Sequence, residues 1–478
     1  MRKSEKLFDA ITDVRDDILH RADARYASMR VPVWKRRWVR SVAALLVVAI
    51  LGGMICWPTG SPLFTSAYAV TTAKYPDMAR YPKTDISGAY DRWREDCRAQ
   101  SRPAGHADGL EEFFAATMQE FLSGAEGENQ AYSPVNVYLA LTMLAELSGG
   151  NSRAQVMDLL GYESLEEMRS QANDIWNANY MNDGKTVSIL GSSLWLNENI
   201  EFEKEVLNRL TETYYASTYQ GEMGSEEYNK ALRDWLNTHT GNLLSKQTRD
   251  IRMDVDTIIA LATTVYLQAK WDNRFSSEKN TQDVFHAPSG DVTAEFMNDR
   301  TEGYYYWGKH FGAVSLRLEN VGAMQIILPD ENVTVEDLLV DEETMAFIQG
   351  KSEWENSKRL FINLSLPKFD ITSETDLIEG LKNLGVTDVF DWRIADFTPM
   401  LGDRESDYLP YVNQAQHDVR VAIDEDGVTA VAYTLISFGV GAAPPPDDEV
   451  DFIVDRPFLF VITGEDNVPL FAGIVNTP

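Results

Sequence analysis

Residues 425–446 of this 478-residue chain read EDGVTAVAYTLISFGVGAAPPP. The segment carries no charge from Gly427 to Pro446, although charged residues make up 24% of the chain and acidic triplets lie at 424–426 and 447–449. In an extended strand alternate side chains point to one face. One face of this segment would then carry Val428, Ala430, Ala432, Thr434, Ile436 and Phe438. Apart from the threonine, that face is apolar.

Two structures are compatible with this segment. A permanently buried core strand explains the missing charge. The acidic triplets and the GVGAAPPP ending are typical of an exposed loop, and exposed loops are seldom this apolar. A segment that is a loop in one state and a central strand in another satisfies both features.

The chain around this segment mixes helical and strand patterns. Apolar residues recur at helical spacing over residues 110–122, and Ser133-Pro134 is typical of a helix start. Strands are expected at 186–196, 257–267, 313–318, 323–328, 360–366, 419–423 and 458–463, and helices at 228–236 and 374–384. Because no Gly/Pro-rich linker interrupts residues 109–478, we expect one large α+β domain.

The N-terminal part has a different composition. Residues 1–40 hold 11 basic and 6 acidic side chains, a net charge of +5 within a chain of net charge -31. An uncharged run follows at 41–57 and would be about 26 Å long as a helix. Val39 and the bracketing Trp38 and Trp57 extend it toward the thickness of a bilayer core. We expect a basic segment at 1–38, a transmembrane helix or signal anchor at 39–57, a Pro/Tyr-containing stalk at 58–107, and the large domain at 108–478.

Charge also predicts the orientation of the anchor. Four basic residues lie at 35–40, whereas Lys74 is the only basic residue among the twenty that follow Trp57. The N-terminus is therefore expected in the cytoplasm and the acidic domain outside the cell, on a single-pass membrane protein. Cleavage of a signal peptide near Ala69, followed by secretion, is the alternative.

Catalytic, metal and nucleic-acid functions find little support. The chain has no G-x-S-x-G, H-E-x-x-H, P-loop or C-x-x-C motif, and its six histidines lack metal-ligand spacing. A nucleic-acid-binding protein needs basic residues to displace counterions from the phosphates, and the acidic composition of this chain excludes that class. A triad of Ser133, His417 and an aspartate can be assembled, but nothing in the sequence brings these residues together. We expect no enzyme activity, no cofactor and no metal site.

At this point the chain resembles the serpin family, over about residues 108–478. The motifs that carry the resemblance occur in the family's order. They are NQAYSPVNVYLALTML (129–144), YLQAKWDNRF (266–275), LPKF (366–369), LG (384–385), VF (389–390), ADF (395–397), HDVRVAIDEDG (417–427), RPFLF (456–460) and PLFAGIVN (469–476).

The resemblance implies a monomeric inhibitor that a serine protease attacks as a substrate. The protease becomes acylated to the cleaved loop, and the N-terminal half of the loop then inserts as a new strand in a central, mostly antiparallel sheet before water can release the protease. Its partners would be the target protease, in a covalent acyl complex, and the membrane. A non-inhibitory serpin that acts as a binding or chaperone-like surface protein is the alternative.

Positions carry over from the family's motifs. Glu425, Gly427 and Val428 correspond to the hinge, which continues through Thr429, Ala430, Val431 and Ala432. Counting along the loop places the attacked bond at Gly441–Ala442, with Ala443 and Phe438 as alternatives. Small residues there favour elastase-like or subtilisin-like proteases, and Phe438 a chymotrypsin-like one. Ser133, Asn136, Thr263, Trp271 and His417 match the residues that control sheet opening. Val428, Asn136 and Thr263 depart from the residue types common in the family.

Overall fold

The computed structural model describes residues 67–78, 80–82, 88–100, 106–125, 127–350, 354–402, 410–428, 446, 448–464 and 466–478. The expected cytoplasmic segment and the membrane segment 39–57 lie outside the described residues. Within those ranges no helix is both long and apolar enough to cross a bilayer. The membrane anchor thus stays a prediction.

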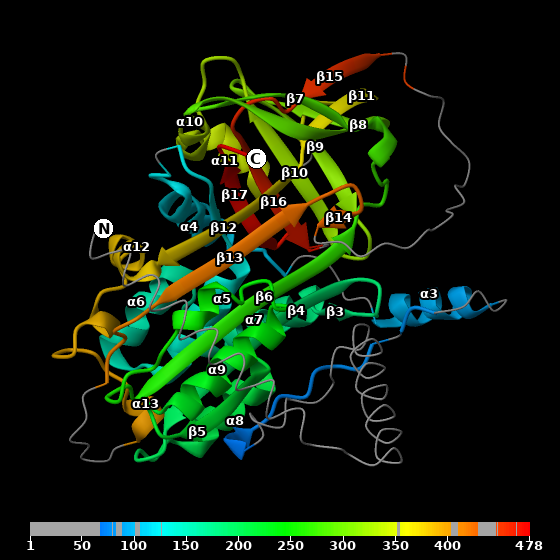
Figure 1. Ribbon diagram of the computed structural model, residues 1–478. Coiled ribbons are helices and arrows are strands. Elements are labelled where there is room, and N and C mark those ends of the chain that lie inside the picture. Colours follow the sequence, from blue (N-terminus) through cyan, green and yellow to red (C-terminus); the bar gives the residue numbers. More distant parts are fainter. Residues whose placement is uncertain are drawn as a thin grey trace, which may run out of the picture. The chain divides into compact units, whose positions relative to one another are not determined.

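The described strands form two sheets (Figure 1). The first sheet has the order β1-β5-β4-β6-β14-β13-β12, with β3 attached to β4. Its strands are β1 (Ala69–Thr71), β3 (Met181–Asn182), β4 (Val187–Asn197), β5 (Ala216–Gly221), β6 (Ile259–Lys270), β12 (Phe369–Asp376), β13 (Gln416–Ile423) and β14 (Gly427–Val428). Neighbouring strands are antiparallel except β4 and β5.

The second sheet has the order β15-β11-β8-β9-β10-β16-β17-β2, with β7 attached to β8. Its strands are β2 (Gln130–Tyr132), β7 (Thr281–Ala287), β8 (Gly290–Trp307), β9 (Phe311–Leu318), β10 (Gly322–Pro329), β11 (Ser357–Pro367), β15 (Glu449–Ile453), β16 (Phe458–Gly464) and β17 (Pro469–Val475). The strands β16 and β17 are buried along their whole length and form the centre of this part of the core.

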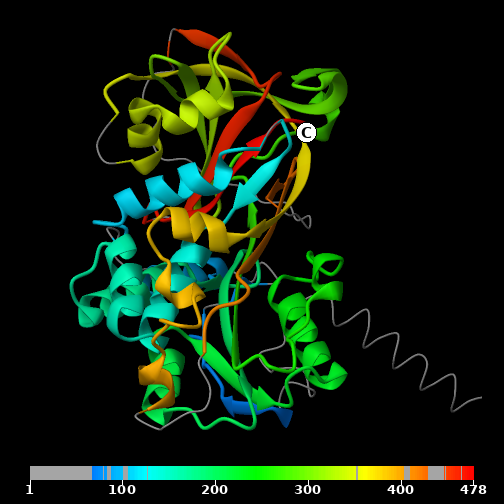
Figure 2. The same ribbon diagram turned by 90° about the vertical axis from the view of Figure 1, so that its left-hand side faces the viewer.

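Helices cover both faces of the first sheet. The α-helices are α3 (Ala89–Gln100), α4 (Glu111–Leu122), α5 (Pro134–Leu147), α6 (Gly150–Leu160), α7 (Leu165–Asn179), α8 (Lys204–Thr213), α9 (Glu226–His239), α10 (Val335–Val340), α11 (Glu342–Gln349), α12 (Leu377–Asn383) and α13 (Thr398–Leu401). Both α9 and α5 contact β6. The helix α9 lies on one face of the sheet, and α5, α6 and α7 lie on the opposite face (Figure 2).

The α+β class and the expected strands are confirmed, and one helix boundary is wrong. Residues 374–384 were expected to be helical, but the first three belong to β12, which pairs with β13 over its whole length. The helix α12 begins only at Leu377, where the Asp376 side chain accepts a hydrogen bond from the Ile378 amide. Pairing with a neighbouring strand overrides the local helical pattern here.

Residues 67–78 and 80–82, here called the N-terminal strap, pack against the edge of the first sheet. The strap adds β1 beside β5, and the Gln220 amide donates to the Tyr68 carbonyl at 2.8 Å. Further along the strap, the Ala73 amide donates to Ser217 Oγ at 3.1 Å and the Tyr81 amide to the Asp183 carbonyl at 2.6 Å. The strap thus lies along several elements of the domain.

Tyr75 anchors the strap in an aromatic cage. Its ring centroid lies 5.2 Å from that of Trp176, 5.5 Å from that of Tyr180 and 6.2 Å from that of Tyr215. Burial raises the pKa of the Tyr75 hydroxyl above its usual value. The strap is part of the expected Pro/Tyr-containing stalk at 58–107, and in the structure it is packed on the domain. The other boundaries stay predictions.

We expect Tyr75→Ala to release the strap without unfolding the domain. Removing the ring deletes the contacts with the cage, a loss of about 3 kcal/mol for a large aromatic side chain. Hydrogen exchange of the β1 amides should then accelerate about a hundredfold. Lys74→Ala, at the exposed neighbouring position, is the matched control. Unchanged protection of β1 in Tyr75→Ala would show that the cage does not hold the strap.

Candidate functional site

The hinge begins as a tight turn between β13 and β14. The Asp424 amide donates to the Gly427 carbonyl at 3.0 Å, and Asp424 Oδ1 accepts from the Asp426 amide at 2.9 Å. These bonds fix the turn and place Val428 opposite Ile423. The chain thus reverses within four residues and runs back beside β13.

The two residues of β14 already lie inside the first sheet, between β13 and β6. Gly427 pairs with Lys270, and Val428 pairs with Ala269 and is 3% exposed. Gly427 has φ +155°, and a Cβ at this position would lie 2.2 Å from the Ala269 carbonyl oxygen. A side chain there would clash with backbone, so the position requires glycine.

Beyond Val428 the sheet has an opening, here called the slot. No described residue of β6 pairs with β13, although each strand pairs with its other neighbour. A cavity of about 30 Å³ lies between the two strands; its lining includes Val265 and Leu267 of β6, Val419 and Val421 of β13, and Val428. Further residues of a strand that continues β14 would enter at this place.

The first turn of α5 contacts both strands that border the slot. The Ser133 amide donates to His417 Nε2 on β13 at 2.9 Å, and Thr263 Oγ1 on β6 donates to Asn136 Oδ1. Ser133 also caps the helix, since its hydroxyl accepts from the Asn136 amide at 3.4 Å. The start of one helix therefore connects both sides of the slot.

His417 is held as a neutral imidazole. It is 5% exposed, and burial lowers its pKa from 6.5 to about 4. Because Nε2 accepts the hydrogen bond from Ser133, the ring proton resides on Nδ1. A second proton on the ring would abolish this acceptor.

The geometry does not form a catalytic triad. Ser133 Oγ donates to the Leu470 carbonyl at 2.6 Å, whereas His417 accepts from the backbone amide of Ser133. The imidazole therefore does not accept the hydroxyl proton, which a nucleophilic serine requires. Within the described part of the chain no group of three His, Cys, Asp or Glu residues could hold a metal ion.

Trp271 and Phe275 hold the backbone of the hinge turn. The indole Nε1 of Trp271 donates to the Asp424 carbonyl at 2.8 Å, and its amide donates to the Asp426 carbonyl at 3.0 Å. The Phe275 amide donates to the Glu425 carbonyl at 3.2 Å. Three successive carbonyls of the turn are thus satisfied by the segment that follows β6.

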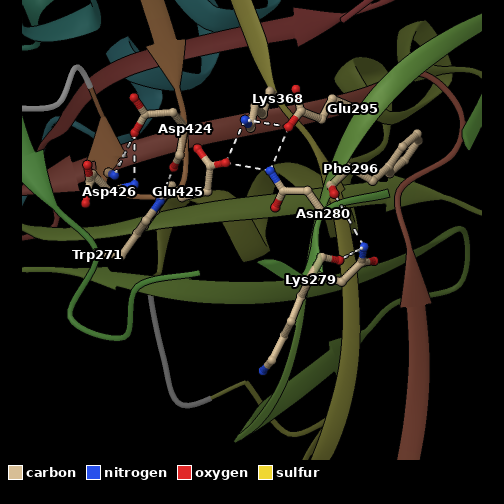
Figure 3. Close-up of polar contacts among 11 residues, drawn as sticks. Trp271, Lys279, Asn280, Glu295, Phe296, Lys368, Asp424, Glu425 and Asp426 are labelled. Carbon is tan, nitrogen blue, oxygen red and sulfur yellow. Dashed lines mark hydrogen bonds and ion pairs between the residues drawn. The ribbon is translucent and has the colours of Figure 1, made fainter. Parts of the chain in front are cut away.

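The Glu425 carboxylate is tied to the second sheet through Lys368 (Figure 3). Lys368 Nζ lies 2.7 Å from Glu425 Oε1 and 2.9 Å from Glu295 Oε1, and Asn280 Nδ2 donates to both carboxylates. Burial disfavours ionisation of Glu425, but the hydrogen bonds from Lys368 and Asn280 outweigh it and lower the pKa. One lysine between two carboxylates therefore connects the hinge to β8.

The structure gathers the expected residues into two groups. Ser133, Asn136, Thr263 and His417 meet beneath the slot. Trp271 bonds to Asp424 and Asp426, in the turn that carries the hinge residues Glu425, Gly427 and Val428. The remaining expected hinge and reactive-bond residues lie outside the described residues: Thr429, Ala430, Val431, Ala432, Phe438, Gly441, Ala442 and Ala443.

Sequence reasoning missed the partners of Glu425. Lys368 lies within the LPKF motif at 366–369, which was noticed, but no role was assigned to the lysine. Asn280 and Glu295 lie in no motif and are more than a hundred residues from Glu425 in the sequence. No sequence signal could have identified these two.

Comparison with known proteins finds relatives that match most of the chain. Serpin-ZX of Arabidopsis thaliana is 25% identical over 369 residues, covering 74% of this chain and 93% of that protein. Plasminogen activator inhibitor 1 of Bos taurus is 25% identical over 381 residues, covering 77% of this chain and 91% of that protein.

Solved structures share the fold. The thermophilic serpin tengpin in its native state has a TM-score of 0.68 at 23% identity, with 86% of this chain and 100% of that chain covered. Thyroxine-binding globulin in complex with thyroxine has a TM-score of 0.66 at 18% identity, with 77% and 98% covered. The family model described as serpin (serine protease inhibitor) matches residues 109–478, and the chain belongs to this family.

Proposed function

We propose that the chain is a suicide-substrate inhibitor of serine proteases. A protease cleaves the loop that follows Val428, becomes acylated to it, and is trapped when the N-terminal half of the loop enters the slot. The observation that carries this proposal is the position of β14. Its two residues lie between β6 and β13, and the strands bordering the slot are not paired with each other.

The two described ends of the loop support its role as bait. Val428 belongs to the first sheet, whereas Glu449 begins β15 of the second sheet (Figure 1). Cleavage between these ends would free the N-terminal part to follow β14. The fourteen residue steps from Gly427 to Gly441 would span about 46 Å as a strand, long enough to carry an attached protease far from its starting position.

The absence of charge from the loop fits the requirements of insertion. A strand added between β6 and β13 forms main-chain hydrogen bonds on both sides. An unpaired charge directed into the sheet would cost several kcal/mol and slow insertion, so that hydrolysis would release the protease first. Val428, already buried in the sheet, shows the kind of side chain that this environment accepts.

The loop composition favours proteases with shallow or apolar specificity pockets. Gly441, Ala442 and Ala443 suit elastase-like or subtilisin-like enzymes, and Phe438 suits a chymotrypsin-like one. No Lys or Arg lies between Glu425 and Pro446, which disfavours a trypsin-like target. Mass spectrometry of the peptide released by each protease identifies the attacked bond.

The alternative is a serpin that binds a ligand without inhibiting a protease. Thyroxine-binding globulin, which shares the fold, was solved in complex with thyroxine. A protease panel separates the two functions, because an inhibitor gives a covalent adduct that survives denaturing detergent. A non-inhibitory relative gives clean cleavage or none.

We further propose that the inhibitor is membrane-tethered, with its N-terminus in the cytoplasm and its domain outside the cell. The basic residues before position 41 and the uncharged run up to Trp57 support this arrangement. The position of Ala69 argues against signal cleavage there, because Ala69 belongs to β1 and pairs with Tyr219 of β5. Protease added to intact cells should digest the domain and spare the N-terminal 40 residues. Recovery of the domain in the medium would contradict the tether.

We expect Val428→Arg to convert the inhibitor into a substrate. The guanidinium would have to enter a position that is 3% exposed between two strands, which slows insertion relative to hydrolysis. The number of inhibitor molecules consumed per protease trapped should rise at least tenfold. Denaturing gel electrophoresis measures the adduct.

Val284→Arg is the matched control, because Val284 is 41% exposed on β7. This control should form adduct at the wild-type rate. Should Val428→Arg misfold, Val428→Thr tests the same position with a smaller polar group and should give an intermediate ratio. Full adduct formation by a correctly folded Val428→Arg protein would contradict loop insertion.

We expect His417 to make the uncleaved domain less stable in acid. Its pKa is about 4 when folded and 6.5 when exposed, so from pH 6.5 down to pH 4 the unfolded chain binds a proton that the folded chain does not. The contribution of His417 to the free energy of unfolding is fully present above pH 6.5 and falls by about 1.4 kcal/mol per pH unit between pH 6.5 and pH 4.

Urea unfolding at pH 7 and pH 5 measures this loss. His239, whose pKa is also lowered to about 4, contributes a similar loss. His417→Gln keeps an acceptor for the Ser133 amide but cannot be protonated, so this variant should lose about 2 kcal/mol less than the wild type. His310→Gln, at an exposed position, is the matched control and should behave as the wild type. Equal acid sensitivity of His417→Gln and the wild type would show that His417 does not titrate as described.

A further inference from the structure

A second cavity lies between strands of the second sheet, outside the slot. The strands β8 and β9 pair only from Tyr305 opposite Val314 to Trp307 opposite Gly312, and they diverge beyond Tyr305. A cavity of about 300 Å³ occupies the gap, here called the fork cavity. This volume is at the lower end of the range usual for small-molecule pockets.

The fork cavity combines an apolar interior with a polar rim. The buried side chains that line it are Trp271, Phe275, Val314, Ile362 and Leu364. Tyr304 and Tyr306 add two aromatic rings that stack with centroids 6.2 Å apart and planes inclined by 28°. A flat ring system is the shape that packs best on such a lining.

The charges of the rim leave one cation uncompensated. Asp299 lies 2.7 Å from Lys279 Nζ, and Glu302 forms an ion pair with Arg359. Arg317 also lines the cavity, is exposed, and has no ion-pair partner among the residues that the structure describes. Once both acids are neutralised, the rim carries one net positive charge, in a chain of net charge -31.

We propose that the fork cavity binds a small aromatic anion, a flat ring system carrying a carboxylate or sulfonate. Its rings pack on Trp271, Phe275 and the two tyrosines, and its anionic group pairs with Arg317. The guanidinium is suited to this role because it presents several donors in one plane to a planar or tetrahedral anion.

The occupant would contact the residues that hold the hinge. Trp271 and Phe275 line the fork cavity and also bond to the carbonyls of Asp424, Glu425 and Asp426. A ligand packed on the indole restrains the donor of the Asp424 bond. We therefore expect the bound anion to slow adduct formation about fivefold, the lower end of typical coupling between two sites. This second effect rests on the proposed inhibitory function.

Calorimetry on the full-length chain with naphthalene sulfonate tests the site. Naphthyl methanol, which has the same rings without the charge, should bind at least tenfold more weakly. Arg317→Gln should weaken sulfonate binding about tenfold and leave naphthyl methanol unaffected, and Ser315→Trp should abolish binding of both by filling the cavity. Arg300→Gln removes an exposed guanidinium outside the lining and is the matched control.

The outcomes separate the two parts of the proposal. Absent binding, or equal binding by Arg317→Gln and the wild type, would overturn the site. Because calorimetry does not depend on a protease, failure of the chain to inhibit any protease would leave this result valid. Binding combined with an unchanged rate of adduct formation would overturn the coupling to the hinge alone.

Discussion

The structure depends on a sheet in which two central strands, β6 and β13, are not paired with each other over the described residues. The strands β6 and β13 are neighbours only through the two residues of β14, and beyond Val428 they border an opening. Unpaired main-chain groups in a protein interior are costly, so a sheet in this arrangement retains a strong tendency to accept a strand. The proposed inhibitory function requires this tendency to be restrained until the loop is cut.

Three sets of contacts restrain the sheet, and each uses a different interaction. At the base of the slot, α5 bonds β13 through Ser133 and β6 through Asn136. At the entrance of the slot, Trp271 holds the hinge turn through main-chain carbonyls. The Glu425 side chain of the turn is therefore available for the third contact. That contact is the ion pair of Glu425 with Lys368. Because this ion pair is partly exposed, it contributes little to stability, but it ties the hinge turn to Glu295 of β8 in the second sheet.

The sequence predicted the fold class and seven of the described strands, because these leave local signals. The Ser133-Pro134 pair marks the start of α5 whatever packs on it, and an uncharged run in an acidic chain is visible without a structure. The slot could not be predicted, since it is a missing pairing between strands about 150 residues apart. The packing of the strap could not be predicted for a related reason, because only the cage formed by Trp176, Tyr180 and Tyr215 makes Tyr75 an anchor.

The outer edges of the first sheet explain why a strand would be added in the middle. An open edge strand is the usual place for strand addition, and proteins cover such edges to avoid association. At one edge β1 of the strap covers β5. At the other edge the outer strand is β12, where the Ala131 amide of β2 donates to Ser373 Oγ at 2.7 Å. Each outer part of the first sheet thus has a contact beyond the sheet's central strands, whereas no described strand lies between β6 and β13 beyond Val428. In the proposed mechanism the strap therefore occupies one edge of the sheet, while the slot stays available to the inserting loop.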